Sequence, residues 1–238
     1  MAIHLSVVIP VYNERYLVAA SVERVLRFSS SRVSRVDVII VDDGSTDGSS
    51  AILSELAEKH PERITLVRHE ANRGKGAAVR TGIERARGDV TVIHDADLEY
   101  DPESFDLMMI PFEREDADAV YGSRFLTRTY RRVLYYRHSL GNLLLTHLCN
   151  LISDLNLTDM ETCYKAVRGD LARSLVGELA SDRFGFEPEI TARLAKRDAR
   201  IYEVPISYAG RTYAEGKKIN WKDGIAAFWH ILKFNLIG

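Results

Sequence analysis

The sequence has few of the features that mark secreted, membrane-spanning or zinc-binding proteins. Its two cysteines, Cys149 and Cys163, stand in no spacing typical of metal ligands. No stretch approaches the roughly 20 apolar residues that span a bilayer, so we do not expect the chain to cross a membrane by itself. The N-terminus lacks the charged and apolar segments of a secretion signal. We therefore expect a protein of the reducing cytoplasm.

The chain also lacks a net charge that would draw it to a polyanion. It carries 32 Lys and Arg against 34 Asp and Glu, a formal net charge of -2. No overall field then directs it to nucleic acid or anionic lipid, and any such attraction must come from local patches. Its 238 residues, 46% of them hydrophobic, are enough to bury roughly 70% or more of the unfolded surface around one core. We expect one domain over residues 1–238.

Apolar, β-branched runs alternate with segments of helical periodicity through the first half of the chain. The predicted strands are residues 5–10, 36–41, 64–67, 90–93 and 119–121, and the predicted helices between them are 16–28, 49–60, 75–87 and 103–114. This alternation predicts an α/β fold, a mostly parallel central sheet with helices on both faces. Ligands of such a fold bind at the carboxyl ends of the strands.

The second half has a different pattern. A basic, aromatic loop over 127–136 precedes a predicted leucine-rich helix over 139–155 and a predicted strand over 201–207. The predicted helix at 221–236 carries an apolar stripe: Trp221, Ile225, Phe228, Trp229, Leu232 and Leu236. Such an amphipathic helix can lie flat in a membrane interface, and packing on the core explains the stripe nearly as well.

Two loop sequences in the first half can each be interpreted as a ligand site or as a structural feature. Asp42 and Asp43 follow the second strand, where a carboxylate can bind a base or ribose or can cap the next helix. Residues 72–76, Asn-Arg-Gly-Lys-Gly, open a helix whose amides could face an anion. A close-packed helix start accounts for these glycines equally well. The first strand ends without glycines, which argues against a dinucleotide-binding dehydrogenase.

The fourth strand delivers a cluster of carboxylates. In extended chain alternate residues point the same way, so Asp95, Asp97 and Glu99 would converge. Crowded carboxylates repel unless a cation lies among them, and hard oxygen ligands suit Mg²⁺ or Mn²⁺ bridging a diphosphate. His94 has no cysteine partner, so we interpret it as a strand histidine rather than a zinc ligand.

Six motifs in order resemble the inverting glycosyltransferases of family 2, above all the dolichol-phosphate mannose synthases and their bacterial polyprenyl-phosphate relatives. They are PVYNE at 10–14, VDDGSTDG at 41–48, NRGKGAA at 72–78, DADLEYDP at 95–102, GSRF at 122–125 and RTYAEGKK at 211–218. The resemblance implies a GT-A fold, with nucleotide sugar and metal bound by residues 1–125 and the acceptor by residues 126–238.

The resemblance also implies roles for single residues. The nucleotide diphosphate sugar would be bound by Pro10, Tyr12, Glu14, Asp42, Lys75, Asp95, Arg211, Lys217 and Lys218. Mg²⁺ or Mn²⁺ would be bound by Asp95, Asp97 and Glu99. Family members often have Gln at the position of Glu99, so its charge is a departure from the pattern. GDP-mannose is the first choice of donor and UDP-glucose the next.

Two acceptors demand different chemistry. A hydroxyl acceptor needs a general base, whereas a phosphate monoester is already an anion at pH 7. We expect a polyprenyl phosphate, because arginines cluster after the fifth strand and Arg donates paired hydrogen bonds to phosphate. The acceptor phosphate would be bound by Arg124, Arg131, Arg132, Arg137 and Ser139.

The alternative is a hydroxyl acceptor with Asp159, or Glu161, as base. The candidate catalytic residues are thus Asp97, Arg124 and Asp159. A nucleic-acid-binding role would explain the aromatic and basic residues at 130–137. It does not explain the carboxylate cluster of Asp95, Asp97 and Glu99. We expect an enzyme at the inner membrane surface that binds no nucleic acid.

Overall fold

A seven-stranded sheet forms the centre of the molecule. The computed structural model describes residues 2–126, 132, 133, 135–211 and 221–237, with side chains of the last range from Gly224 onward. The strands are β1 (Ile3–Val11), β2 (Val33–Asp42), β3 (Ile64–Arg68), β4 (Val90–Ile93), β5 (Ala119–Ser123), β6 (Lys165–Arg168) and β7 (Ile201–Pro205). Their order is β3-β2-β1-β4-β6-β5-β7. Only β6 runs antiparallel to its neighbours among these strands.

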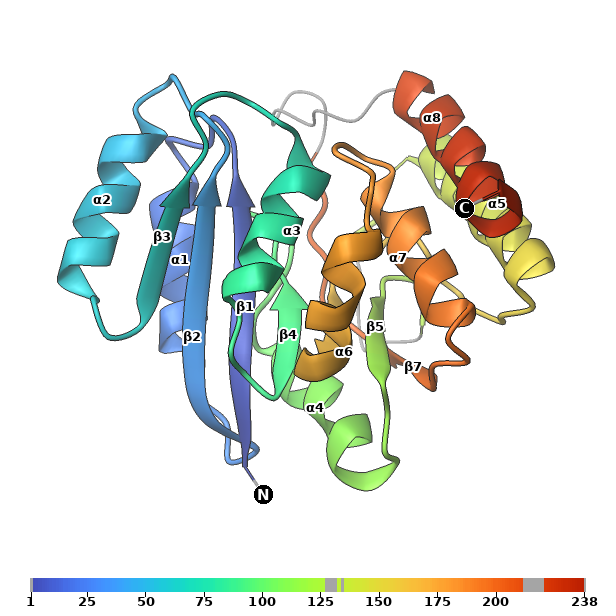
Figure 1. Cartoon of the computed structure of the whole chain (residues 1–238), viewed down its shortest axis with the longest axis horizontal. Coiled ribbons are helices and arrows are strands. Elements are labelled where there is room, and N and C mark those ends of the chain that lie inside the picture. The colour runs from blue at the N-terminus through green and yellow to red at the C-terminus, as the bar shows by residue number, and fades with distance from the viewer. Residues whose placement is uncertain (1, 127–131, 134, 212–220, 238) are drawn as a thin grey trace.

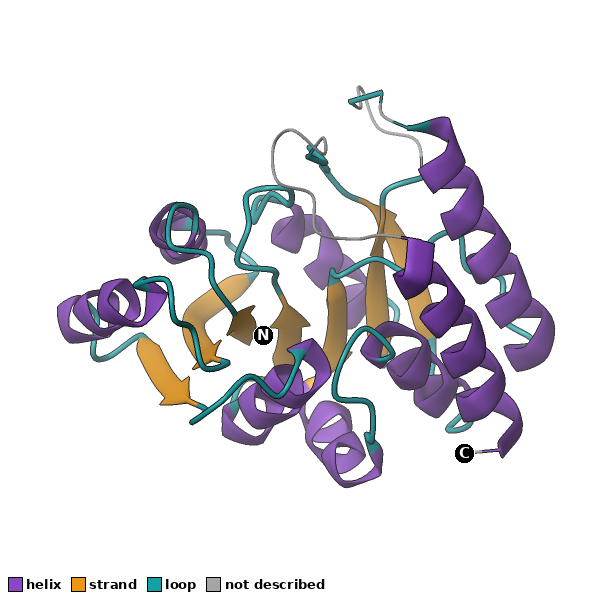
Figure 2. Ribbon diagram, turned by 90° about the horizontal axis from the view of Figure 1, so that it is seen from above, coloured by secondary structure: helices purple, strands orange, loops and turns teal. Residues whose placement is uncertain are grey.

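Helices cover both faces of this sheet. They are α1 (Val18–Arg27), α2 (Ser49–Lys59), α3 (Lys75–Arg85), α4 (Ser104–Arg114), α5 (Tyr136–Ser153), α6 (Gly169–Leu175), α7 (Phe186–Ala195) and α8 (Trp221–Leu232), which continues as a π-helical segment (Lys233–Ile237). Figure 1 shows α3, α6 and α7 in front of the sheet and α1 and α4 behind it, and Figure 2 shows both layers from above. The predicted α/β class, with a mostly parallel sheet between helices, is confirmed.

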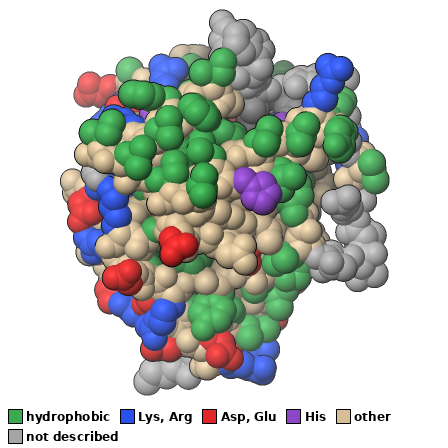
Figure 3. Space-filling model, turned by 90° about the vertical axis from the view of Figure 1, so that its right-hand side faces the viewer, with side chains coloured by type: hydrophobic (Ala, Val, Ile, Leu, Met, Phe, Trp, Pro, Cys, Tyr) green, Lys and Arg blue, Asp and Glu red, His purple; other side chains and the backbone are tan. Residues whose placement is uncertain are grey.

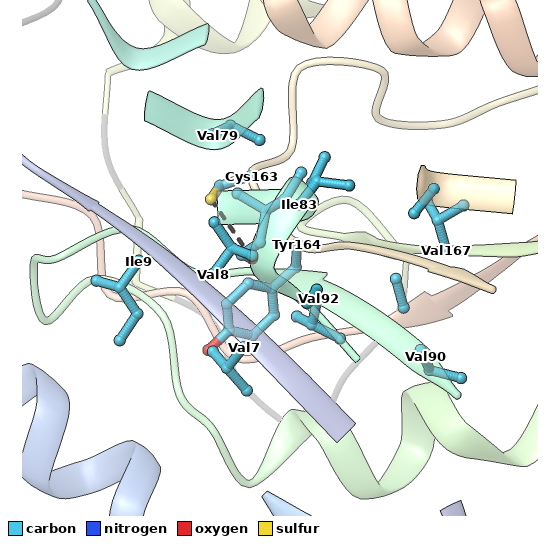
Figure 4. Close-up of a cluster of buried hydrophobic side chains, with 14 of the residues drawn as sticks. Val7, Val8, Ile9, Val79, Ile83, Val90, Val92, Cys163, Tyr164 and Val167 are labelled. Atoms are coloured by element: carbon cyan, nitrogen blue, oxygen red, sulfur yellow. Dashed lines mark hydrogen bonds between the residues drawn. The ribbon is translucent and has the colours of Figure 1, made fainter. Parts of the chain in front are cut away.

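The central strands are apolar along their length because both of their faces are covered. In β1 all but two residues are buried. Figure 4 shows the cluster in which Val8 of β1 and Val92 of β4 lie close to Val79 and Ile83 of α3, with Tyr164 beside them. This packing holds the carboxyl ends of β1 and β4 in one place, where their loops begin.

Helices α5 and α8 contact each other along one side of the molecule, at the right in Figure 1. The inward side of α8 is Ala227 and Ile231, both buried, followed by the buried Phe234. Ile225 and Trp229 are more than half exposed. The apolar stripe predicted from the sequence therefore faces outward.

Strand β6 and helices α6 and α7 have no counterpart in the sequence prediction. Strand β6 has four residues and includes the buried Lys165, whose ammonium donates to the carbonyls of Met160 (2.7 Å) and Thr162 (2.5 Å). A buried lysine interrupts the apolar pattern by which a buried strand is predicted from sequence, so β6 was not predicted. Of the two unpredicted helices, α7 brings Glu187 to the site described below.

Candidate active site

A cavity of about 1140 Å³ opens at the carboxyl ends of the strands. One part of its wall comes from the loops after β1 and β4, and another from α5 and α8. The residues predicted from the sequence that line it are Pro10, Tyr12, Glu14, Lys75, Asp95, Asp97, Glu99, Arg124, Arg137 and Arg211. Most of the predicted donor site is thus gathered around one space.

The turn after β1 places Tyr12 and Glu14 on this wall. Asn13 between them has φ 53°, a left-handed conformation that Asn tolerates better than most residues. Its side-chain oxygen accepts a hydrogen bond from the amide of Thr46 (2.8 Å), and its own amide donates to Ser45 Oγ (3.1 Å). The loops after β1 and β2 therefore hold each other in place.

The acidic pair at the end of β2, Asp42 and Asp43, lies differently from the prediction. Asp42, expected to bind the nucleoside, is buried outside the cavity wall and accepts from the amide of Ser45 (3.0 Å) and from Ser50 Oγ. Asp43 lines the cavity instead and accepts from the amides of Arg73 (2.9 Å) and Gly74 (2.7 Å). Because adjacent residues point to opposite sides, the choice between the two was not visible in the sequence.

The glycine-rich start of α3 is a packing device. A Cβ on Gly74 would lie 2.3 Å from the carbonyl oxygen of Asp182, and one on Gly76 would lie 2.1 Å from that of Ser181. The amide of Ala77 already donates to Asp182 O (3.1 Å). Of the two explanations of the Asn-Arg-Gly-Lys-Gly segment, the close-packed helix start is the one that the structure supports.

His94 is a structural histidine, as interpreted from the sequence. It is buried directly after β4, and its ring nitrogens share hydrogen bonds with Tyr164 OH (2.9 Å) and Ser21 Oγ (3.1 Å). Burial lowers its pKa to about 4. A neutral imidazole in this setting braces the loop that carries the carboxylates.

Side-chain cations already pair with the three carboxylates after β4. Lys75 Nζ lies 2.9 Å from Asp95 Oδ1 and 2.8 Å from Glu187 Oε1. Arg211 lies 2.9 Å from Asp97 through Nη2 and 2.8 Å from Glu99 through Nε. Arg211 thus ties its own segment to the loop after β4, which lies more than 100 residues earlier in the sequence.

These cations do not fully offset the negative charge. Burial, together with the charges of Asp95 and Glu99, raises the pKa of Asp97 to about 7. Burial acts against ionisation of Asp95 as well, but the ammonium of Lys75 outweighs it and lowers the pKa. Within the described residues no three His, Cys, Asp or Glu side chains are placed to hold a metal ion. The donor chemistry nevertheless fits a hard divalent cation, because Asp97 is left short of positive charge.

Arg124 and Asp159 form a closed pair. Arg124 donates from Nε to Asp159 Oδ2 (2.7 Å), from Nη2 to Oδ1 (2.7 Å) and from its amide to Oδ2 (3.0 Å). Asp159 is completely buried and does not line the cavity. Burial opposes the charge of Arg124, yet the Asp159 carboxylate raises its pKa above the ordinary value. The paired donors expected to bind the acceptor phosphate are therefore already engaged, and Asp159 is badly placed to serve as a base.

The remaining predicted acceptor residues are spread over different places. Arg137, on α5, lines the cavity, whereas Arg132 Nη1 donates to the carbonyl of Gly210 (2.9 Å) away from the wall. Ser139 is exposed and donates to Tyr135 O (3.4 Å) at the start of α5. Arg131, Lys217 and Lys218 lie outside the described residues.

Two glutamates on the cavity wall come from the second half of the chain. Glu187 stands in the first turn of α7, which the sequence prediction did not include. Glu161 was considered only as an alternative base. The signal for Glu187 was the pair Glu187 and Glu189, separated by Pro188, which is typical of the acidic first turn of a helix.

Comparison with known proteins identifies the class. The family model described as "Glycosyl transferase family 2" matches residues 6–175. The chain therefore belongs to glycosyl transferase family 2, as the six motifs indicated.

Curated relatives carry more particular names. An undecaprenyl-phosphate 4-deoxy-4-formamido-L-arabinose transferase of Edwardsiella ictaluri is 29% identical over 213 residues, covering 90% of this chain and 62% of the relative. A dolichyl-phosphate beta-glucosyltransferase of Dictyostelium discoideum is 28% identical over 230 residues, covering 92% and 69%. A dodecaprenyl-phosphate galacturonate synthase of Rhizobium johnstonii is 27% identical over 216 residues, covering 91% and 62%. The chain thus spans less than two thirds of the length of two of these relatives.

The solved structures agree on the fold. Glucosyl-3-phosphoglycerate synthase of Mycobacterium tuberculosis, in complex with Mn²⁺, UDP and glucosyl-3-phosphoglycerate, superposes with a TM-score of 0.71 at 19% identity, covering 99% of this chain and 81% of that one. At this identity the likeness concerns the architecture. The predicted GT-A fold is confirmed.

Proposed function

We propose that this enzyme transfers a hexose, with inversion, from a nucleotide diphosphate sugar to a polyprenyl phosphate at a membrane surface. The three named relatives support this acceptor, since each name contains a polyprenyl or dolichyl phosphate. All three are under 30% identical to this chain, so the proposal depends on the site as well.

The observation that carries the proposal is the composition of the cavity wall. The carboxylate cluster, with its paired Lys75 and Arg211, forms one part of it, and Leu145 of α5 and Ala227 of α8 belong to another. Its volume of about 1140 Å³ is slightly larger than the roughly 300–1,000 Å³ typical of small-ligand sites. Such a cavity suits a charged donor together with an acceptor that has an anionic head and an apolar tail.

The donor half of the proposal assigns the predicted residues. Pro10, Tyr12 and Glu14 would contact the nucleoside, while Lys75 and Arg211 would contact phosphates. Asp95, Asp97 and Glu99 are the residues that would hold Mg²⁺ or Mn²⁺. The metal would neutralise charge that develops on the departing nucleotide diphosphate.

The acceptor half needs cations, because the acceptor phosphate must approach an anionic donor. Like charges about 4 Å apart repel by roughly 4 kcal/mol at an effective dielectric near 20. Arg137 is the described member of the predicted acceptor set, apart from Arg124, that lines the cavity. We assign it to the acceptor phosphate and give Arg124 the role of fixing the loop that contains Asp159.

A hydroxyl acceptor with Asp159 as base is the less favoured function. Both oxygens of that carboxylate accept hydrogen bonds from Arg124, and the side chain has no access to the cavity. A general base must reach the proton that it removes.

The named relatives change the order of donors proposed. GDP-mannose was the first expectation, but the Dictyostelium relative is a glucosyltransferase, and structures of the mycobacterial synthase contain UDP-glucose. We therefore place UDP-glucose ahead of GDP-mannose.

The membrane surface would be met by the outer sides of α5 and α8. The exposed apolar residues there are Leu140, Leu143, Leu144 and Leu151 of α5 and Ile225, Phe228 and Trp229 of α8. Figure 3 looks onto this side and shows hydrophobic side chains gathered in its upper half. No helix in the described part of the chain is long and apolar enough to cross a bilayer. An interfacial contact is the mode of attachment that fits this surface.

Transfer assays test the proposal. The purified chain is incubated with UDP-glucose or GDP-mannose, Mn²⁺, and either a short polyprenyl phosphate or a simple sugar alcohol. We expect a lipid-linked product whose NMR coupling constant reports an inverted anomeric centre. Retention, or equal transfer to the sugar alcohol, would contradict it.

A further inference from the structure

Glu161 has a carboxylate oxygen that nothing in the described part of the chain satisfies. The residue lines the cavity, and its Oε1 atom is buried with no hydrogen-bond partner among the described residues. Buried polar groups without a partner are rare in native structures and cost free energy. Because the side chain lines a substrate cavity, the unpaired oxygen points to a ligand that supplies the missing donor.

The cations whose charges act on the carboxyl of Glu161 are Lys165 and Arg124, and both are committed to other groups. Lys165 donates to the carbonyls of Met160 and Thr162, and its ammonium lies 4.7 Å from the centre of the Tyr121 ring. Arg124 is engaged by Asp159, and Lys75 by Asp95 and Glu187. None of these hydrogen bonds or ion pairs goes to Glu161.

The surroundings select the chemical class of the ligand. Burial and the charge of Glu187 raise the pKa of Glu161 to about 7, so the site is already rich in negative charge. A phosphate would be repelled there. A neutral hydroxyl can donate to the oxygen without bringing further charge into the buried site, and its own desolvation is small beside that of an ion.

The position relative to the carboxylate cluster indicates which part of the donor would arrive. Lys75 joins Asp95 to Glu187 through two ion pairs. Glu187 is in turn the charged residue with the strongest effect on the pKa of Glu161. If the diphosphate binds at Asp95 and Asp97, the group attached beyond it reaches the Glu187 side of this chain of contacts. That group is the transferred sugar.

We propose that Glu161 recognises the transferred sugar by accepting a hydrogen bond from one of its hydroxyl groups, and so helps to determine which sugar is used. This inference rests on the proposed function. It makes Glu161 a specificity residue rather than a base.

The test combines substitutions of Glu161 with changes to the sugar. Glu161→Ala removes the acceptor, and Glu161→Gln keeps an acceptor oxygen without the charge. Glu58→Ala, an exposed glutamate on α2, is the matched control. Each protein is assayed with UDP-glucose and its 2-, 3-, 4- and 6-deoxy and deoxyfluoro analogues, or with the GDP-mannose series if that donor is the one used. Thermal melting verifies that every variant is folded.

The expected result is a coupling with one hydroxyl. Glu161→Ala should lower kcat/KM for the parent sugar roughly 10- to 100-fold, the usual range for losing a hydrogen bond to a charged group. With one deoxy analogue and its fluoro counterpart, the wild-type enzyme should already show that loss and Glu161→Ala should add little. Glu161→Gln should fall between the two, and Glu58→Ala should match the wild type.

Three other outcomes overturn the inference. If the losses multiply for every analogue, Glu161 contacts no hydroxyl of the sugar. If Glu161→Gln is as inactive as Glu161→Ala while donor affinity measured by calorimetry is unchanged, the residue is a base. If the wild-type protein binds no nucleotide sugar, the proposed function fails and this inference with it, whereas normal binding and transfer without coupling removes this inference alone.

Discussion

The guanidinium of Arg124 and the carboxylate of Asp159 meet through two hydrogen bonds of 2.7 Å each, with Asp159 completely buried. Removing one partner of such a pair leaves a buried charge uncompensated, which costs about 3–5 kcal/mol. We expect Asp159→Asn and Arg124→Ala each to lower the free energy of unfolding by about that amount, and Arg124→Lys by less. Urea denaturation of each variant measures the free energy of unfolding.

The large effect expected for Asp159→Asn is therefore structural, and it does not require Asp159 to act as a base. The double variant Arg124→Ala with Asp159→Asn provides the control, because it should be less harmful than the sum of the single changes. An Asp159→Asn protein as stable as the wild type that binds donor yet transfers nothing would favour the general-base alternative.

A substitution of Gly76 by Ala at the start of α3 should destabilise the protein. In Gly76→Ala the new Cβ would overlap the carbonyl oxygen of Ser181, so we expect a loss of about 1–3 kcal/mol or more of stability. Because Lys75 is the neighbouring residue, donor affinity should fall as well. Gly177→Ala is the matched control, since nothing lies within 4 Å of its Cβ position. Equal melting temperatures for the two variants would contradict the packing argument.

Asp97 should reduce the stability of the metal-free protein as pH rises. Its pKa is about 7 in the fold and near 3.9 when unfolded, so between these values the native state binds more protons. The free energy of unfolding then decreases with rising pH across that window. In EDTA, Asp97→Asn should melt above the wild type at pH 8, and the difference should shrink toward pH 5. The exposed Asp154→Asn serves as control and should show no such trend.

The same carboxylate should make metal use depend on pH. We expect EDTA to abolish transfer and Mg²⁺ or Mn²⁺ to restore it. Because a proton and a metal compete for Asp97, half-maximal activity should need less metal at pH 8 than at pH 6.5. Metal titrations at the two pH values measure this. Full activity of Asp97→Ala in metal-free buffer would remove the metal from the mechanism.

Membrane binding should depend on the outward side of α8. Phe228 and Trp229 are 49% and 57% exposed, so replacing both with Glu should leave the fold intact and weaken liposome flotation about tenfold or more. Tyr16→Glu is the control, because Tyr16 is 90% exposed outside α5 and α8. Point changes are preferable to deleting α8, whose Ile231 and Phe234 are buried. Equal flotation of all three proteins would exclude this surface.

Local pattern determined much of the architecture. The strands from β1 to β5 and the helices between them exist close to their predicted ranges, because a buried parallel strand and an amphipathic helix each carry a periodicity readable within one segment. The carboxylates after β4 were identifiable for the same reason. They follow a strand whose carboxyl end must face the ligand edge of the sheet.

Tertiary structure decided what each charged group does. Strand β6 pairs with β4 and β5, which lie more than 40 residues away, so its own four residues could not reveal it. The assignment of Asp43 rather than Asp42 to the cavity depends on which way one peptide turns. Arg124 and Asp159 stand 35 residues apart. The sequence indicates both as candidate functional residues. Their contact in the fold shows that they form one structural ion pair instead. An ion pair forms where two side chains come within a few ångströms, and that distance is set by the packing of the whole fold.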